Sequence, residues 1–147
     1  MNDLELKYYN HPEMQKLFRE RMGEWKAGDR YHCPNDNPEL FHKAKIIKDG
    51  YFDSMKYDSE GKLGSFVNPE PCCPDVCIRL PLPIDQRSPE RGLAGMVSGT
   101  WMLQKWGDDD YELTIREDGD ILYYTGKTST LVLLKALAYQ IGAEVKG

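Results

Sequence analysis

The sequence predicts an α+β fold: a three-stranded antiparallel meander flanked by two helices (α-β-β-β-α), with an N-terminal helix and an irregular or β-hairpin appendage. Two observations carry this prediction. Short apolar-rich runs separated by acidic turns follow one another between residues 100 and 126. A long apolar run with helical spacing then occupies 131–141. We expect an α-β-β-β-α module over 88–147 and an appendage over 1–87, which together form one cooperative unit.

The middle strand is predicted at 111–116, where apolar and polar side chains alternate. Tyr111, Leu113 and Ile115 point to one face, so one face of the sheet is buried and the other is solvated. The neighbouring strands are predicted at 101–106 and 121–124. The dipeptide Asp118-Gly119 before the last strand indicates a tight hairpin, because glycine accepts positive φ without a Cβ clash.

A helix is predicted on each side of the strands. Ser88 and Pro89 suit the N-cap and the first residue of the preceding helix, which Gly92 and Gly95 restrict to two or three turns, partly 3₁₀. The closing helix should cover the apolar face of the sheet and end at Gly142. Its N-cap is one of three neighbouring residues: Thr128, Ser129 or Thr130.

The N-terminal half is patterned less clearly. In residues 1–9, alternation of apolar positions favours an extended segment over a helix. Asn10 is a suitable N-cap for an amphipathic helix whose apolar stripe contains Met14, Leu17, Phe18 and Met22. Candidate hairpins turn at 48–50 and at 58–61. The segment 78–83 is predicted to be extended, and its prolines restrict any pairing to the edge of a sheet.

Charge and hydropathy exclude two classes of partner. The chain has 19 basic and 24 acidic residues, a net charge of −5, which argues against nucleic-acid binding. Double-stranded-RNA-binding domains share the helix–three-strand–helix order, but they carry a Lys-rich cluster where this chain has only Lys127. There is no apolar run of the roughly 20 residues that a membrane helix needs, and no secretory signal. We expect a cytoplasmic protein with reduced thiols.

The four cysteines are the main candidates for a chemical site. Zinc binds four thiolate or imidazole ligands in a tetrahedron. The predicted ligands are Cys33, Cys73, Cys77 and His32, with Cys72 and His42 as alternatives. The chain has no Cys-x-x-Cys pair, however, and this spacing favours the other interpretation, in which the cysteines pack as small apolar side chains.

Aromatic residues of the predicted sheet are a second candidate site. Trp101, Trp106 and Tyr124 could form a surface for a protein partner, because Trp101 and Trp106 have opposite parity in one strand and cannot both be buried. The alternative is that the N-terminal half covers this face. No nucleophile motif, phosphate loop or calcium loop is present.

Several motifs occur together between residues 78 and 142. They are Leu80–Asp85, Pro89–Leu93, Trp101-Met102-Leu103, Tyr111-Glu112-Leu113, Gly126-Lys127-Thr128 and Leu134-Lys135-Ala136-Leu137. In this order they resemble small bacteriophage and prophage proteins, including the phage ABA-sandwich domain. That family has no established activity, so the resemblance implies no site residues.

Together these features predict a non-enzymatic accessory protein of phage or prophage type. It would act in the host cytoplasm by binding another protein, either a second copy of itself or a host or phage protein. The alternative from another class is a small zinc-stabilised domain built on the cysteine cluster. A small enzyme with a cleft between the two halves is a third hypothesis, which no motif favours.

Overall fold

The computed structural model describes residues 3–26, 28–32, 41–48, 51–57 and 77–145, with the backbone alone described over 41–48 and 51–57. The chain divides into two compact units, Met1–Pro81 and Leu82–Gly147. Helices and antiparallel sheets occur as separate segments, so the predicted α+β class is confirmed.

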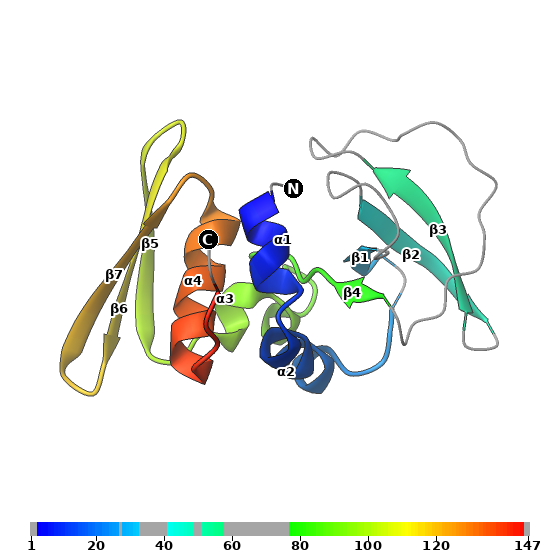
Figure 1. Ribbon diagram of the computed structural model, residues 1–147, viewed down its shortest axis with the longest axis horizontal. Coiled ribbons are helices and arrows are strands. Elements are labelled where there is room, and N and C mark those ends of the chain that lie inside the picture. The colour runs from blue at the N-terminus through cyan, green and yellow to red at the C-terminus, as the bar shows by residue number, and fades with distance from the viewer. Residues whose placement is uncertain (1–2, 27, 33–40, 49–50, 58–76, 146–147) are drawn as a thin grey trace. The chain divides into compact units, whose positions relative to one another are not determined.

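The C-terminal unit has the predicted order of elements (Figure 1). A 3₁₀ turn and a short helix come first, three strands follow, and a long helix closes the unit. These are η1 (Pro89–Arg91), α3 (Leu93–Met96), β5 (Thr100–Gly107), β6 (Asp110–Glu117), β7 (Asp120–Gly126) and α4 (Ser129–Ile141). The strands form a meander in the order β5-β6-β7, each antiparallel to the next.

The two hairpins of the meander have different turns. Asp118 and Gly119 have φ of 51° and 83°, which together make a type I′ turn closed by Glu117 and Asp120. The predicted Asp-Gly hairpin is therefore confirmed. The β5–β6 hairpin closes on Gly107 and Asp110 and is preceded by a bulge at Trp106.

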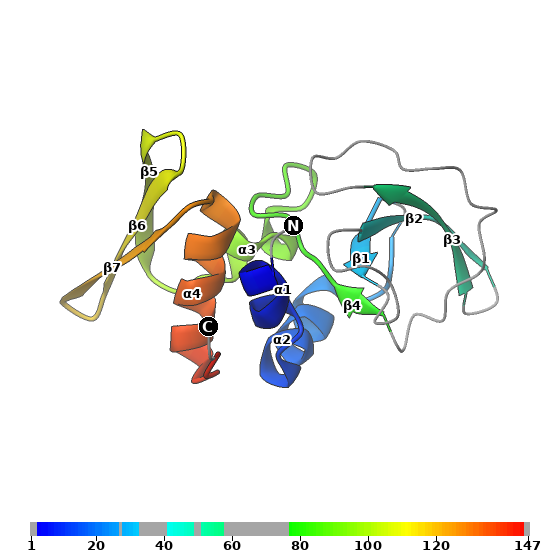
Figure 2. The ribbon, with the colours of Figure 1, turned by 45° about the horizontal axis from the view of Figure 1, so that its top comes forward.

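Helix α4 packs on the apolar face of the meander, as the sequence predicts (Figure 2). Leu113 and Ile115 of β6 are 0% and 1% exposed. Thr128 is the N-cap, because its hydroxyl accepts a hydrogen bond from the Leu131 N–H at 3.0 Å. Gly142 ends the helix in the left-handed conformation, with φ of 74°.

The predicted first helix of the module is split in two. Ser88 precedes the 3₁₀ turn η1, and Gly92 then adopts an extended conformation (φ −87°, ψ 161°) that separates η1 from α3. The carbonyls of Leu82 and Pro83 accept hydrogen bonds from the first N–H groups of α3. This proline-containing segment therefore satisfies the helix end that Gly92, which has no side chain, cannot cap.

The described residues of the N-terminal unit form two helices and a four-stranded antiparallel sheet. The elements are α1 (Asp3–Tyr9), α2 (Pro12–Met22), β1 (Arg30–His32), β2 (Phe41–Lys48), β3 (Tyr51–Tyr57) and β4 (Ile78–Arg79). The strand order is β3-β2-β1-β4, so β4 lies at an edge of the described sheet, as predicted from the prolines that follow it. Lys48 pairs with Tyr51, which confirms the first candidate hairpin, and the second lies outside the described residues.

Two local predictions in this unit are wrong. Residues 3–9 form a helix rather than an extended segment, because Glu5 and Tyr9, four residues apart, are the pair buried on one helical face. The N-cap of α2 is His11 rather than Asn10, since the His11 Nδ1 atom accepts from the Glu13 N–H at 3.1 Å. Of the predicted apolar stripe, Met14, Phe18 and Met22 are buried and Leu17 is half-buried.

The short strand β4 is attached to the rest of its unit by side chains from distant parts of the sequence. The Gln15 amide accepts from the Arg79 N–H and donates to the Arg79 carbonyl, at 2.9 and 3.0 Å. Arg30 donates to the Leu80 and Pro81 carbonyls, and the Tyr9 hydroxyl also donates to Pro81. These side chains thereby satisfy backbone groups of Arg79, Leu80 and Pro81 in the interior of the unit.

None of the helices in the described part of the chain is long and apolar enough to cross a membrane.

Candidate functional site

The three aromatic residues predicted to form a partner surface do not share one face of the meander. In the strand register, Trp101 lies opposite Ile115 and Tyr124 opposite Leu113, both of which are buried beneath α4. Trp106 lies at the bulge of β5, with 63% of its surface exposed. Of the three predicted residues, Trp106 is the exposed one.

Tyr124 belongs to the packing between β7 and α4. Its ring centroid lies 6.3 Å from that of Tyr139 on α4, with the two planes tilted by 59°. Burial raises the pKa of the Tyr124 hydroxyl, and the nearby Tyr139 and Glu117 act in the same direction. Tyr124 therefore contributes to the helix–sheet contact.

The opposite face of the meander carries an apolar row that the sequence analysis did not select. Met102 of β5 lies opposite Thr114 of β6, which lies opposite Tyr123 of β7. Ile121 lies on the same face, two residues before Tyr123. Met102, Ile121 and Tyr123 are 52%, 44% and 65% exposed. Hereafter this surface, made of Met102, Ile121 and Tyr123, is called the outer face.

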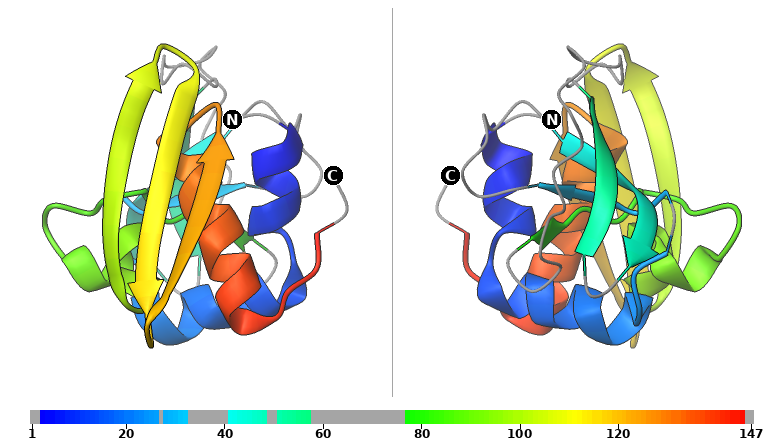
Figure 3. Two further views of the ribbon diagram at one scale, coloured as in Figure 1. Left: turned by 90° about the vertical axis from the view of Figure 1, so that its left-hand side faces the viewer. Right: turned by 90° about the vertical axis from the view of Figure 1, so that its right-hand side faces the viewer.

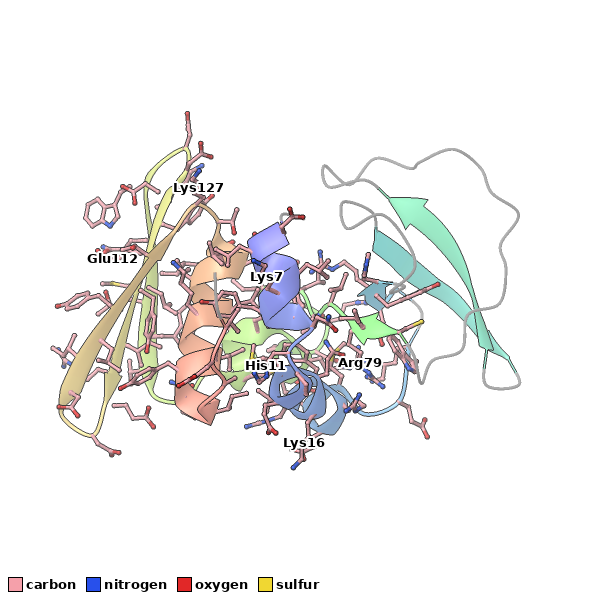
Figure 4. All side chains as sticks on the ribbon, in the orientation of Figure 1. Lys7, His11, Lys16, Arg79, Glu112 and Lys127 are labelled. Atoms are coloured by element: carbon pink, nitrogen blue, oxygen red, sulfur yellow. The ribbon has the colours of Figure 1, made fainter. Side chains whose placement is uncertain are left out.

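Charged residues of opposite sign frame the outer face on the central strand. Glu112 lies at one end, between Gln104 and Thr125, and Arg116 at the other, between Thr100 and Ile121. Glu112 points away from α4 (Figure 4). Viewed from this side, the three strands lie in front of α4 within their unit (Figure 3, left). An apolar centre with a charged rim is typical of protein-binding surfaces.

Strand register is the signal that would have identified the outer face. The type I′ turn at Asp118-Gly119 fixes Glu117 opposite Asp120, and counting back along both strands places Tyr123 opposite Thr114. Thr114 has the opposite parity to the buried residues of β6. Tyr123 must therefore be solvated, whereas Tyr124, its neighbour, faces the helix.

Only some of the predicted zinc ligands lie within the residues that the structure describes. Cys33, Cys72 and Cys73 lie outside the described residues. His32 and Cys77 are both buried, at 3% and 7% exposure, and lie near one another because His32 of β1 pairs with Ile78 of β4. Side chains alternate along a strand, so His32 shares a face with Ile78, while Cys77 precedes Ile78 by one position. Among the described residues, no three His, Cys, Asp or Glu side chains are grouped for a metal.

Comparison of this chain with protein-family models, with curated proteins and with solved structures finds no match.

Proposed function

We propose that this protein is a non-enzymatic accessory protein that binds another protein through the outer face of its meander. The observation that carries the proposal is the shared orientation of Met102, Ile121 and Tyr123, three large apolar side chains that are each 44% to 65% exposed on one face. The motifs of residues 78–142 resemble those of phage and prophage proteins. This resemblance supports a host cell that contains phage proteins as the place where the partner is bound.

The chemistry of these side chains suits a protein contact. Tyrosine combines a large rigid ring with a hydroxyl and is enriched in binding surfaces. Methionine is flexible and polarisable and adapts to irregular partner surfaces. Burying what is exposed of each side chain would contribute on the order of 1 kcal/mol. The expected partner therefore presents an apolar centre, with polar groups that can meet Glu112 and Arg116 at its margins.

Three of the buried polar side chains have structural hydrogen bonds, which favours a binding role for this protein over catalysis by these groups. Gln15 and Tyr9 are bonded to backbone groups in β4 and just after it, and Asp85 accepts from the backbone N–H groups of Arg87 and Ser88. Each of these groups therefore has a structural task in its own unit.

The test is a comparison of two exposure-matched tyrosine variants. Tyr123 on the outer face and Tyr139 on α4 are 65% and 66% exposed. Tagged wild-type protein, Tyr123→Gln and Tyr139→Gln would each be purified from the producing host, and the co-purifying proteins quantified by mass spectrometry. We expect a partner that is lost with Tyr123→Gln and retained with Tyr139→Gln. Equal recovery by both variants would contradict the proposal.

A further inference from the structure

The outward edge of β7 carries backbone groups that the meander leaves unbonded within the sheet. In a two-residue hairpin the closing pair exchanges hydrogen bonds, and bonded and non-bonded pairs then alternate. Since Glu117 and Asp120 close the β6–β7 hairpin, Leu122 and Tyr124 bond to β6. The N–H and C=O groups of Ile121, Tyr123 and Thr125 therefore point away from β6, along the edge of the sheet.

One part of this edge is already occupied. The Lys135 Nζ atom of α4 donates to the Thr125 carbonyl at 2.7 Å, which confirms that this carbonyl faces outward. Lys135 thereby closes the edge at Thr125, and among the described residues of the C-terminal unit the edge from Ile121 to Tyr123 stays open. The other edge strand, β5, is protected differently, by Lys105 and the adjoining bulge. Between Asp120 and Lys127, by contrast, β7 carries no charged side chain.

We infer that β7 pairs antiparallel with β7 of a second copy of this chain, about a two-fold axis at Leu122. Ile121 then lies opposite the partner's Tyr123, and Tyr123 opposite the partner's Ile121, with each pair exchanging both backbone hydrogen bonds. If the two-fold axis lay at Tyr123 instead, Ile121 would pair with the partner's Thr125. The Thr125 carbonyl already accepts a hydrogen bond from Lys135. The Lys135–Thr125 bond therefore selects the register with the axis at Leu122.

The side chains fit the same register. Leu122 is on the α4 side of the sheet yet remains 38% exposed, because it lies at the edge. At the two-fold axis it would lie opposite the partner's Leu122. The two leucines would form a non-hydrogen-bonded pair, the type of antiparallel pair in which opposite side chains lie closest. On the outer face, Ile121 and the partner's Tyr123 would form a β-branched–aromatic cross-strand pair, a favourable combination.

Charge complementarity also favours a second copy. The hairpin tip is acidic, with Glu117, Asp118 and Asp120, whereas the opposite end of β7 is followed by Lys127 (Figure 4). In the antiparallel pair, the acidic tip of each subunit lies beside Lys127 and Lys135 of the other. The two-fold axis repeats this contact, so both ends of the paired strands join opposite charges.

This pairing goes beyond the proposed function, because it uses the edge of the sheet, whereas a protein partner uses its face. It would join two meanders into one continuous sheet and place both outer faces side by side. A protein partner would then meet two copies of the outer face.

The test is sedimentation velocity of the full chain over a wide range of concentrations. Wild type is expected to form a dimer. Tyr123→Pro removes the outward N–H without removing a bond to β6, and Tyr123→Thr is the matched control, which loses the same ring but keeps the N–H. We expect Tyr123→Pro to weaken the dimer at least about tenfold relative to Tyr123→Thr. Wild-type protein that stays monomeric, or equal dissociation constants for the two variants, would overturn the inference.

A charge exchange tests the register, and it remains available if Tyr123→Pro does not fold. Within one chain, Asp120 and Lys127 lie at opposite ends of β7, roughly 20 Å apart, so they cannot compensate for one another. Across the two-fold axis, Asp120 lies opposite the partner's Tyr124, at the end of β7 that leads to the partner's Lys127. Lys127→Glu should weaken the dimer several-fold at low salt, and adding Asp120→Lys should restore it. A double variant as weak as the single one would rule out this register. An intact wild-type dimer together with equal partner recovery by Tyr123→Gln and Tyr139→Gln would contradict only the proposed function.

Discussion

Each of the two units is stabilised internally by a different kind of contact. The contacts differ in how far apart in the sequence the bonded residues lie. In Leu82–Gly147, strands that follow one another in the sequence are neighbours in the sheet, and each pair is joined by a two-residue turn. In Met1–Pro81, the edge strand β4 and the two residues after it are bonded by side chains that lie 50 to 72 residues away. Local pairing leaves a clear pattern in the sequence, whereas bonds between a side chain and a distant backbone leave none.

The same side-chain arrangement occurs in both units among the described residues, in two different environments. The Gln15 amide bonds the N–H and C=O of Arg79 within a buried region, and the Gln140 amide bonds the N–H and C=O of Ser98 at an exposed position. The difference between them is solvent access, which decides whether water can replace a lost hydrogen bond. This pair provides a direct experimental comparison of the two units.

The largest effect is expected in the core of the C-terminal unit. Leu113→Ala should lower the free energy of unfolding by about 3–4 kcal/mol, because Leu113 is completely buried beneath α4 and its removal leaves a cavity. Met102→Ala, on the solvated face of the adjacent strand, should cost less than about 1 kcal/mol. Urea unfolding measures both changes. Similar losses for the two variants would mean that α4 does not cover the predicted face.

Hydrogen exchange of Leu113→Ala also tests whether the chain is one cooperative unit, as the sequence analysis predicts. Amides of both units should then lose protection together. Faster exchange confined to 82–145 would show that the two units unfold independently.

The next effect is a pH dependence that belongs to the N-terminal unit. Burial raises the pKa of the Tyr9 hydroxyl to about 12, although the nearby Arg30 partly opposes the shift. The unfolded chain therefore ionises this group from about pH 10, while the folded chain keeps it protonated. Its contribution to stability is complete below pH 10 and is lost as the pH rises through 12, by up to about 3 kcal/mol.

The Tyr9→Phe variant is the control for this pH dependence. It should lose about 1 kcal/mol at neutral pH with the hydrogen bond to Pro81, and it should lose less stability than wild type as the solution becomes alkaline. Tyr124, whose pKa is also raised, contributes to both proteins and cancels in the comparison. Parallel alkaline unfolding curves for the two proteins would contradict the assignment to Tyr9.

The paired glutamines give the third prediction. Gln15→Leu should cost about 2 kcal/mol, because it leaves the N–H and C=O of Arg79 without their amide partner in a buried site. Gln140→Leu should cost less than about 1 kcal/mol, because water can bond the Ser98 groups instead. Thermal unfolding of both variants gives the comparison, and equal losses would remove the distinction between the two units.

The smallest effect concerns the N-cap of α4. Thr128→Ala should destabilise the protein by about 1 kcal/mol, because the Leu131 N–H loses its acceptor. Thr128→Ser keeps the hydroxyl and should recover most of this loss. If both substitutions cost the same, the methyl group of Thr128 rather than its hydroxyl would be the stabilising element.

Native mass spectrometry of the purified chain would test the zinc prediction and the dimer together. The zinc-stabilised alternative predicts one ion per chain, lost with a chelator that also unfolds the protein. The strand-edge dimer predicts a doubled mass, whether or not an ion is bound. Each result can occur without the other, so the two predictions remain separable.

Residues close in the sequence account for what could be predicted of the fold. The alternation in β6, the Asp118-Gly119 turn and the Gly142 helix end each depend on a few neighbouring residues, and all three predictions are confirmed. Alternation of apolar residues over 3–9 was misleading, because burial there follows Glu5 and Tyr9 on a helix. Residue type and the parity of Trp101 and Trp106 do not separate Tyr123 from Tyr124, whereas the register of β7 on β6 does.

The sequence by itself determined the α+β class, the order of the C-terminal elements and the face of β6 that is buried. Periodicity and turn chemistry act within a few residues, and they are therefore readable without a structure. Only the tertiary structure decided which strand edge stays open, through the bond from Lys135 to Thr125, and which distant side chains hold β4. Those contacts join residues whose proximity results from folding, and no local pattern encodes it.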